Sequence, residues 1–375
     1  MRILMAGGGT GGHLYPAIAV AQELRRRRKN TEIRFVGSRK KLEREIVERY
    51  GFKLEAISAK GMPRRPGLGY LSFLVCTAVS FFETLVVLLR WRPDVILGTG
   101  GYVSGPVILV ASLLKVPSVI HEQNSIPGLT NRVLSTFAEE VHLTFAESRK
   151  YFKRKDHLRL TGNPVRKEIA RGDAEVALRK FGLSLDRKTV LILGGTRGAH
   201  SLNLAVIGTL NRLSQRKDLQ FIIQTGEQDY EWVRHSLAFY GARVHVLPYF
   251  TAIGDAYSCS DLVVCRAGAM TVSEIATCGI PAVFVPYPHA VYGHQVQNAR
   301  NLVDRGAAEM ILDSELNADI LATTIERLVD DPARLKRMSM SARSFARHDT
   351  AERIAKSLLE FGSEARRSKR NVHDD

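Results

Sequence analysis

Short apolar runs alternate with longer helix-like segments throughout the first half of the chain. The runs have the length of buried strands and cover residues 2–6, 32–36, 53–57, 94–97 and 118–121. Strands that alternate with helices in this way are typical of βαβ units. The first half is therefore predicted to be a doubly wound α/β domain built on a parallel sheet.

The same alternation starts again in the second half, where an apolar run at residues 189–193 leads into glycines. Further strand candidates follow at 219–224, 243–247, 261–265 and 281–285. A second domain of the same class is expected. The two halves also share a glycine-rich stretch directly after their first strand, at 8–13 and 194–200.

Turn residues mark the expected boundary between the two domains. They cluster at 161–164, which predicts domains of residues 1–163 and 164–346. The final segment, 363–375, is polar and lacks apolar periodicity, so it is predicted to be disordered.

Residues 71–89 form the most apolar segment and contain a single charge, Glu83. Their length would allow a transmembrane helix. Strand-like runs on both sides argue against that, because a spanning helix would divide one sheet between the two faces of a bilayer. We expect a crossover helix whose apolar outer face lies in a membrane interface, rimmed by Arg64 and Arg65 before the segment and by Arg90 and Arg92 after it. The alternative is a fully buried helix.

Charge is concentrated in the first half of the chain. The formal net charge is +16, of which residues 1–160 carry +13 (26 Lys and Arg against 13 Asp and Glu). Such a field attracts lipid headgroups, phosphorylated substrates or nucleic acid, although it could also serve solubility alone. The four cysteines form no Cys-x-x-Cys pair, and the N-terminus lacks the pattern of a signal peptide, which together favour reduced thiols in a cytosolic protein.

A glycine motif follows the first strand, with glycines at 7, 9 and 12. It matches the dinucleotide fingerprint, but the second strand ends in Gly37-Ser38-Arg39 without the expected acidic residue, which argues against NAD. Backbone N–H groups in such a loop can still approach a phosphate or a sugar. His13, at the start of the following helix, is a candidate general base, or it simply packs there.

Two other polar segments follow the fourth and fifth strands, at 98–102 and 121–124. In an open parallel sheet, ligands bind at the carboxyl ends of the strands. These segments and the first glycine loop are therefore expected to share one rim.

The second half offers a matching set of groups for a nucleotide. The loop at 194–198 could hold a diphosphate, with Arg166 as a charged fork. The segment 266–274 opens a helix, where Glu274 could accept both ribose hydroxyls or simply compensate the helix dipole. His294, Gln295 and Asn298 offer uncharged donors and acceptors for sugar hydroxyls, or they form a solvated helix face. The sequence contains no Asp-x-Asp, so no metal clamp is expected.

Seven segments together resemble the MurG family of glycosyltransferases. They are GGGTGGH at 7–13, GTGGYVSGP at 98–106, HEQN at 121–124, TGNPVR at 161–166, GGTRGA at 194–199, CRAGAMTVSEI at 265–275 and HQVQNA at 294–299. The resemblance covers residues 2 to about 345 and implies a GT-B fold, two Rossmann-like domains that face each other across a cleft. It also implies a helix over 347–362 that returns to the first domain.

The family resemblance implies an inverting transfer of N-acetylglucosamine from UDP-N-acetylglucosamine to undecaprenyl-diphosphate-linked N-acetylmuramoyl-pentapeptide, with no cofactor, at the cytoplasmic face of the cell membrane. His13 is the first candidate base and Glu122 the second; the sequence does not separate them. The implied substrate contacts are Thr10, Gly11, Gly12 and Asn124 for the donor sugar, Arg166 and Thr196 for its diphosphate, Phe250 for uracil, Ala269, Met270, Thr271, Val272, Ser273 and Glu274 for uridine, Gln295 for the sugar, and Gly9, Gly100, Gly101 and Tyr102 for the acceptor diphosphate.

Three other functions remain open on the sequence. A UDP-N-acetylglucosamine 2-epimerase would share the fold and the donor but would not need an apolar outer helix. A glycolipid synthase with diacylglycerol as acceptor would use the same architecture. A basic nucleic-acid-binding module would account for the charge, but the basic run at 25–29 lacks stacking aromatics.

Overall fold

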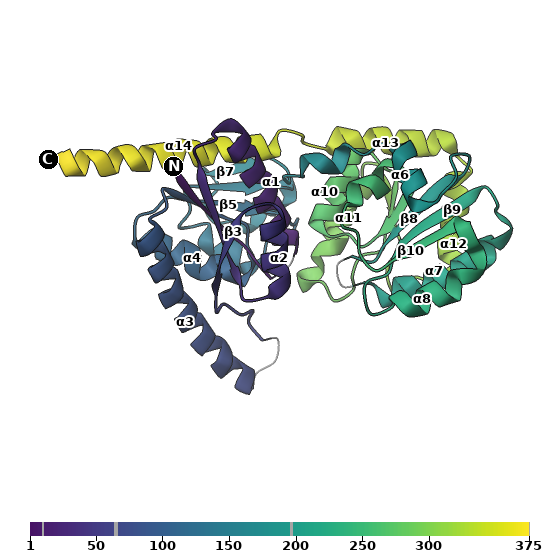
Figure 1. Ribbon diagram of the computed structural model, residues 1–375, viewed down its shortest axis with the longest axis horizontal. Coiled ribbons are helices and arrows are strands. Elements are labelled where there is room, and N and C mark those ends of the chain that lie inside the picture. The colour runs from purple at the N-terminus through teal and green to yellow at the C-terminus, as the bar shows by residue number, and fades with distance from the viewer. Residues whose placement is uncertain (10, 64–66, 196–197, 375) are drawn as a thin grey trace. The chain divides into compact units, whose positions relative to one another are not determined.

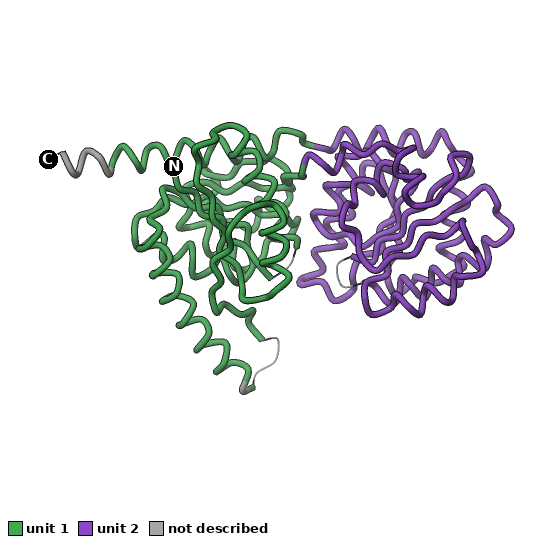
Figure 2. Tube along the Cα trace, viewed as in Figure 1, with its two compact units in different colours: residues 1–166, 347–375 green, residues 167–346 purple. Residues whose placement is uncertain are grey.

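The computed structural model describes residues 1–9, 11–63, 67–195 and 198–374. The chain divides into two compact units (Figure 2). Unit 1 consists of residues 1–166 and 347–375, and unit 2 of residues 167–346. The division falls three residues after the boundary expected from the turn cluster at 161–164.

Unit 1 is built on a seven-stranded parallel sheet with the order β3-β2-β1-β4-β5-β6-β7. The strand order reverses between β1 and β4, which is the switch point where doubly wound sheets bind ligands. The strands are β1 Arg2–Ala6, β2 Glu32–Ser38, β3 Lys53–Ile57, β4 Val95–Gly98, β5 Ser118–Glu122, β6 Glu140–Leu143 and β7 Leu158–Leu160.

Helices cover both faces of this sheet (Figure 1). Leu14, Ile18 and Leu24 of α1 pack on one face together with Ile354 and Leu358 of α14, while α3 and α4 cover the other face. The helices of unit 1 are α1 Gly11–Arg27, α2 Lys41–Arg49, α3 Leu68–Trp91, α4 Gly101–Leu113, α5 Leu129–Leu134, the 3₁₀ helix η1 Ala146–Tyr151, and α14 Thr350–Asp374.

Unit 2 contains a six-stranded parallel sheet with the order β10-β9-β8-β11-β12-β13. Here the order reverses between β8 and β11. The strands are β8 Lys188–Leu193, β9 Leu219–Gln224, β10 Val244–Leu247, β11 Leu262–Cys265, β12 Ala282–Phe284 and β13 Ala308–Met310.

Buried side chains of β8, β9 and β11 form one core with helices α7 and α12. The α-helices of unit 2 are α6 Ala174–Phe181, α7 His200–Arg212, α8 Tyr230–Leu237, α9 Ile253–Ser258, α10 Ala269–Cys278, α11 His294–Val303, α12 Ala318–Val329 and α13 Pro332–Phe345. Its 3₁₀ helices are η2 Lys167–Ala170, η3 Leu213–Gln215, η4 Ala238–Arg243 and η5 Val291–Gly293.

Helix α3 has two unlike faces. Ser80, Thr84 and Leu88 are buried and repeat at every fourth residue, which is the spacing of one helix face. The opposite face is exposed and apolar, and Figure 1 shows the amino-terminal half of α3 extending beyond the sheet. The exposed side chains are Leu71, Leu74, Val75, Val79, Phe82 and Leu89. We call these six residues the α3 apolar face.

In the described part of the chain, α3 is the one helix long and apolar enough to cross a membrane, judged by length and composition. Its stretch Gly69–Trp91 has a mean hydropathy of 2.1, and 17% of its most apolar window is buried. The alternative of a fully buried helix is therefore wrong.

The C-terminal segment corrects one expectation. Helix α14 runs from Thr350 through Asp374, although residues 363–375 were expected to be disordered. Glu364, Ala365, Arg366 and Arg367 all have high helix propensity, so a polar segment can still prolong a helix that packing has already started.

Candidate active site

His13 lies in the first turn of α1, directly after the loop that follows β1. Its Nδ1 is 2.8 Å from the Thr99 carbonyl oxygen and 3.1 Å from Oε1 of Gln123. Both partners accept, because the Gln123 amide nitrogen itself donates to Thr99 at 2.9 Å. Nδ1 therefore carries the proton, which makes Nε2 the basic nitrogen of the ring.

A second histidine, His121, holds this arrangement in place through Gln123. Gln123 Nε2 donates to Nδ1 of His121 at 3.0 Å, and Nε2 of His121 donates to the Gly162 carbonyl at 3.0 Å. Complete burial lowers the pKa of His121 to about 3. The neutral ring thus holds the Gln123 amide, which in turn sets the orientation and tautomer of His13.

The loop between β4 and α4 requires glycine at its closest approach to His13. Gly101 has φ +76°, and a Cβ there would lie 2.4 Å from the Gly8 carbonyl oxygen and 3.2 Å from Cδ2 of His13. A Cβ on Gly100 would lie 3.3 Å from Cε1 of His13. The two glycine loops therefore meet at the switch point between β1 and β4, with His13 between them.

Glu122 is buried, but its carboxylate is already engaged. Oε1 accepts from the backbone and side-chain nitrogens of Asn124, at 2.8 and 3.3 Å. Oε2 accepts from Asn131 Nδ2 at 2.9 Å and from the Gly128 backbone at 3.2 Å. Burial raises the pKa of Glu122 above its usual value, although these hydrogen bonds oppose the rise. The carboxylate thus organises the loop after β5, which positions Asn124.

The sequence analysis missed a second buried carboxylate, Glu43 of α2. Oε1 accepts from the Gly9 backbone at 2.7 Å and from the Ser38 hydroxyl at 2.7 Å, while Oε2 accepts from the Ser38 backbone at 2.8 Å. Glu43 therefore links the first glycine loop to the end of β2. A glutamate in the first turn of the helix after that strand was the available signal.

Arg166, the last residue of the first segment of unit 1, is 8% exposed. Its guanidinium stacks 4.1 Å from the centre of the Tyr15 ring and donates to the Tyr50 hydroxyl at 2.5 Å. Stacking leaves the edges of a guanidinium able to pair with an oxyanion. The Tyr102 ring lies against the first glycine loop, because a Cβ on Gly9 would meet this ring at 2.9 Å.

In unit 2, the start of α10 follows β11 at the second switch point. Glu274 is 6% exposed, and its Oε2 accepts a hydrogen bond of 3.1 Å from the Tyr257 hydroxyl. Gln295 uses its carbonyl oxygen to bind the backbone N–H groups of Ala267 and Tyr287, at 3.1 and 2.9 Å. Its amide nitrogen remains as the group that could meet a sugar hydroxyl.

The structure brings the predicted residues together in two groups, one in each unit. Thr10, Arg64, Arg65 and Thr196 lie outside the described residues. In unit 1, the predicted residues lie at or after the carboxyl ends of parallel strands: Gly9, Gly11, Gly12, His13, Gly100, Gly101, Tyr102, Glu122, Asn124 and Arg166. In unit 2, Phe250, Ala269, Met270, Thr271, Val272, Ser273, Glu274 and Gln295 do the same.

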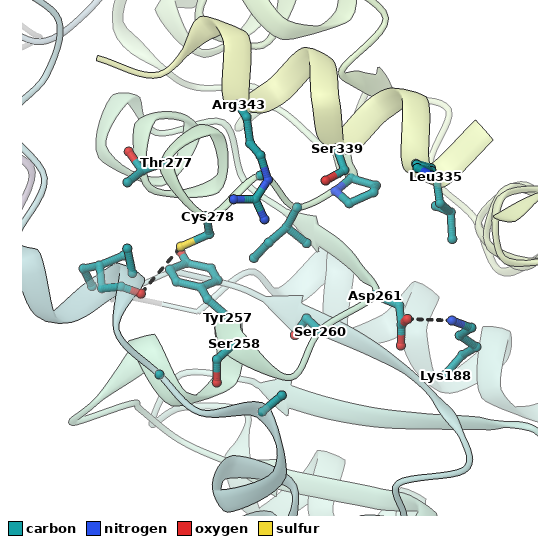
Figure 3. Close-up of a pocket in the computed structure, with 18 of the residues that line it drawn as sticks. Lys188, Tyr257, Ser258, Ser260, Asp261, Thr277, Cys278, Leu335, Ser339 and Arg343 are labelled. Atoms are coloured by element: carbon teal, nitrogen blue, oxygen red, sulfur yellow. Dashed lines mark hydrogen bonds and ion pairs between the residues drawn. The ribbon is translucent and has the colours of Figure 1, made fainter. Parts of the chain in front are cut away.

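A cavity of about 510 Å³ lies at the opposite edge of the unit 2 sheet (Figure 3). Lys188 begins β8 and pairs with Asp261 at 2.8 Å, just before β11, so the cavity is at the amino ends of these strands. Substrates of doubly wound folds bind at the carboxyl ends. The cavity is therefore a poor candidate for the donor site.

Among residues 1–9, 11–63, 67–195 and 198–374, no group of three or more His, Cys, Asp or Glu side chains could hold a metal ion.

Comparison with known proteins shows which family this chain is similar to. The glycosyltransferase family 28 N-terminal domain matches residues 3–143, and the family 28 C-terminal domain matches residues 189–354. A protein of Thermoanaerobacter sp. (strain X514), named UDP-N-acetylglucosamine–N-acetylmuramyl-(pentapeptide) pyrophosphoryl-undecaprenol N-acetylglucosamine transferase, is 41% identical over 95% of this chain and 98% of its own length. A protein of the same name from Geobacter sulfurreducens is 41% identical over 96% and 98%.

The chain belongs to the MurG family. The crystal structure of Acinetobacter baumannii MurG has a TM-score of 0.74 and 29% sequence identity, and the match covers 96% of this chain and 99% of that one. The predicted family and the predicted GT-B class with two Rossmann-like domains are therefore confirmed.

A second group of solved structures shares only the fold with this MurG-family chain. The UDP-GlcNAc 2-epimerase from Neisseria meningitidis, bound to UDP-GlcNAc, has a TM-score of 0.68 at 14% identity, over 96% of this chain and all of that chain. Identity at that level carries no information about the reaction.

Proposed function

We propose that this chain transfers N-acetylglucosamine from UDP-N-acetylglucosamine to undecaprenyl-diphosphate-linked N-acetylmuramoyl-pentapeptide, in peptidoglycan synthesis. The observation that carries the proposal is the full-length similarity to transferases with that name, at 41% identity. The site geometry adds an oriented base in unit 1 and a buried carboxylate suited to ribose in unit 2.

His13 is the proposed general base. Because Nδ1 is held as a donor to Thr99, Nε2 can take the proton of the acceptor hydroxyl. That oxygen then forms a bond to the anomeric carbon of the sugar, while the bond from this carbon to the β-phosphate oxygen breaks. The anomeric configuration inverts, and UDP leaves. Glu122 is less suited, because hydrogen bonds from Asn124, Gly128 and Asn131 engage both of its oxygens.

The leaving diphosphate would be stabilised by Arg166 and by backbone N–H groups at helix starts. The glycine loop after β8 has positive φ at Gly195 and Gly198, which suits close approach of a phosphate. Uridine would lie over Ala269–Glu274, with Phe250 contacting uracil through its backbone. The lipid diphosphate would be held by the loops of Gly9 and Gly100–Tyr102.

We propose that unit 1 docks on the anionic cytoplasmic leaflet as a peripheral protein. The α3 apolar face supports this, because six large apolar side chains remain exposed on one helix. The excess of basic residues in positions 1–160 would add electrostatic attraction to the same surface.

The deciding experiment incubates the chain with radiolabelled UDP-N-acetylglucosamine and a short-chain analogue of the lipid acceptor. The expected result is a β-1,4-linked disaccharide product and stoichiometric UDP, unaffected by EDTA. The same donor without acceptor should stay unchanged. Conversion of the donor alone to the manno epimer would overturn the transferase assignment in favour of an epimerase. Product formation with diacylglycerol in place of the lipid diphosphate would overturn the acceptor assignment.

A further inference from the structure

The cavity at the amino ends of the unit 2 strands has no part in the proposed transferase reaction. None of the residues proposed to bind the donor or the acceptor lines it. Its volume of about 510 Å³ lies within the range of about 300–1,000 Å³ that small-molecule sites occupy. Residues of η2, α9, α10 and α13 line it, together with Lys188 at the start of β8.

One face of α13 offers polar groups to this cavity. Lys336, Ser339 and Arg343 line it, and their spacing of three and four residues places them on one side of the helix. In the described part of the chain, no hydrogen bond or ion pair engages these three side chains. Figure 3 shows Ser339 and Arg343 extending from α13 into the cavity. Two cations and a hydroxyl are therefore available to a ligand.

Arg343 also has a structural explanation, which accounts for its charge but not for its N–H groups. Gly279 ends α10 in the left-handed conformation, and a Cβ there would lie 2.8 Å from Cζ of Arg343. A cation at this place interacts favourably with the dipole at the end of the helix. The α10 carbonyls nearby already accept from the backbone N–H groups of Gly279 and Ile280, each at 3.1 Å. The guanidinium is not needed to cap them and can pair with an anion.

The described lining has more cations than carboxylates. The cations are Lys188, Lys336 and Arg343, and the carboxylate is that of Asp261. Asp261 is already engaged, because Oδ1 pairs with Lys188 at 2.8 Å and Oδ2 accepts from the Thr189 backbone at 2.8 Å. The charges of Lys336 and Arg343 thus remain unbalanced. A phosphate monoester, which carries about −1.5 to −2 at pH 7, would balance both.

Much of the remaining lining is apolar. Ile169, Ile280, Leu335 and Tyr257 contribute to it, and the Tyr257 hydroxyl donates to Glu274. The hydroxyls of Ser258 and Ser260 donate to backbone carbonyls of α9 and add no free donor. A ligand with an apolar or cyclic body next to its anionic group would therefore use more of the cavity than a bare anion would.

We propose that this cavity binds a soluble phosphate monoester with an apolar or cyclic body. The Arg343 guanidinium would pair with two phosphate oxygens, and Lys336 and Ser339 would meet the others. The phosphate of a phospholipid is a diester with a single charge, so it matches the two unbalanced cations less well. Binding would add contacts between α10 and α13 and stabilise unit 2.

This site is distinct from the donor site, although α10 takes part in both. The first residue of α10, Ala269, belongs to the proposed uridine site, whereas Thr277 and Cys278 at its other end line the cavity. Ligands of the two sites should therefore bind at the same time. The inference does not depend on which reaction the chain catalyses.

Phenyl phosphate is the probe, titrated by calorimetry into the full-length protein with and without saturating UDP. We expect a single site with a Kd of roughly 0.1 to 1 mM that UDP leaves unchanged. Inorganic phosphate should bind at least about fivefold more weakly, because it has no ring to contact the apolar lining. Methyl phenyl phosphate, a diester with one charge, should also bind about fivefold more weakly.

Arg343→Gln tests the assigned contacts, because it removes the charge and keeps most of the length. We expect the Kd for phenyl phosphate to rise about tenfold or more, the usual cost of a hydrogen bond between charged groups. Arg337→Gln is the matched control, since Arg337 lies on α13, has a side chain that is 68% exposed and does not line the cavity. It should change the Kd by less than about twofold. Affinity for UDP should stay the same in both variants.

The contrary outcomes are distinct. An unchanged Kd in Arg343→Gln, or an equal loss in Arg337→Gln, would mean that phosphate binds elsewhere or through general charge. Displacement of phenyl phosphate by UDP would place the probe in the donor site. Each of these results, or the lack of saturable binding at millimolar concentration, overturns the inference. Equal affinity for the diester overturns the choice of a monoester. A chain that failed the transferase assay could still give every expected result here.

Discussion

At the scale of single residues, the orientation of His13 is the feature with the most direct consequence for chemistry. Its ring is held through Nδ1 by the Thr99 carbonyl and Gln123. We expect His13→Ala to lower kcat by about 10² to 10⁴, the usual contribution of a general base. Calorimetric titration with UDP should show unchanged affinity. A kcat within a few-fold of wild type would rule out His13 as the base.

Glu122→Gln should behave differently, because the Glu122 carboxylate holds a loop. A glutamine would place an N–H₂ group against some of the nitrogens that now donate to the Glu122 carboxylate. We expect a loss of about 1–3 kcal/mol in the free energy of unfolding of unit 1, measured with urea. The kcat that remains should keep the pH profile of wild type. A loss of the acidic limb of that profile, where the base loses its proton, would instead identify Glu122 as the base.

His121 should make the stability of unit 1 depend on pH. Its pKa is about 3 in the fold against 6.5 for a free histidine, so below pH 6.5 the unfolded chain binds a proton that the folded chain does not. Stability from this group is complete above pH 6.5 and falls as the pH drops towards 3, by about 1.4 kcal/mol per unit. We expect His121→Gln to reduce the slope of the unfolding free energy against pH, measured with urea between pH 7 and 5. The reduction should approach the equivalent of about one proton. Identical slopes would mean that His121 is charged in the fold.

The residues that the sequence could identify are those whose chemistry is local. His13 and the glycines of the first loop follow a strand in the printed sequence, so their place at the switch point could be predicted. The bonds from Glu43 to Gly9 and from Tyr257 to Glu274 join residues that are distant in the chain. Periodicity and motifs do not reveal such contacts. A helix would accept either glutamate equally well if its side chain faced solvent.

At the scale of elements, continuous apolar runs predicted ten of the strands, and all ten occur. β6, β7 and β13 were not predicted. They are short, contain charged residues and lie at or near a sheet edge, where burial on both faces is not required. The helical continuation of α14 was missed for a related reason, since a polar surface helix needs propensity and not burial.

Helix α3 yields a prediction about membrane binding. Leu74 and Phe82 are 59% and 68% exposed on the α3 apolar face. Replacing both by Glu would place two charges at the lipid boundary, so we expect binding to vesicles containing anionic phospholipid to fall by about tenfold or more. Activity on a water-soluble acceptor analogue should change less than about twofold, because neither side chain contributes to the core.

Phe239→Glu is the matched control for this prediction. Phe239 is 93% exposed and lies in unit 2. Phe239→Glu replaces an exposed aromatic side chain by a charged one, as Phe82→Glu does. Vesicle binding should nevertheless stay unchanged. Equal loss of binding in the control and in the α3 variant would show that general charge, and not the α3 apolar face, governs the interaction.

At the scale of the whole molecule, the chain leaves unit 1 at Arg166 and returns to it at Arg347. The return is anchored by the Thr350 hydroxyl, which donates to the Thr161 carbonyl at 2.6 Å. Ile354, Ala355 and Leu358 then enter the same core as α1 and are fully buried. Unit 1 is therefore completed by a segment that follows the whole of unit 2 in the sequence.

In a chain that ends at residue 346, unit 1 should consequently fail to fold, while unit 2 should still fold. Each large side chain removed from the core costs about 1.5–3 kcal/mol of burial, and the sum approaches the whole stability of a typical domain. We expect calorimetry to show one remaining unfolding transition, with UDP binding retained through unit 2. A chain that ends at Arg367 keeps all three buried residues and should unfold as the full chain does. Two unchanged transitions in the shorter chain would mean that residues 2–166 fold without α14, and that the return of the chain to unit 1 serves a purpose other than stability.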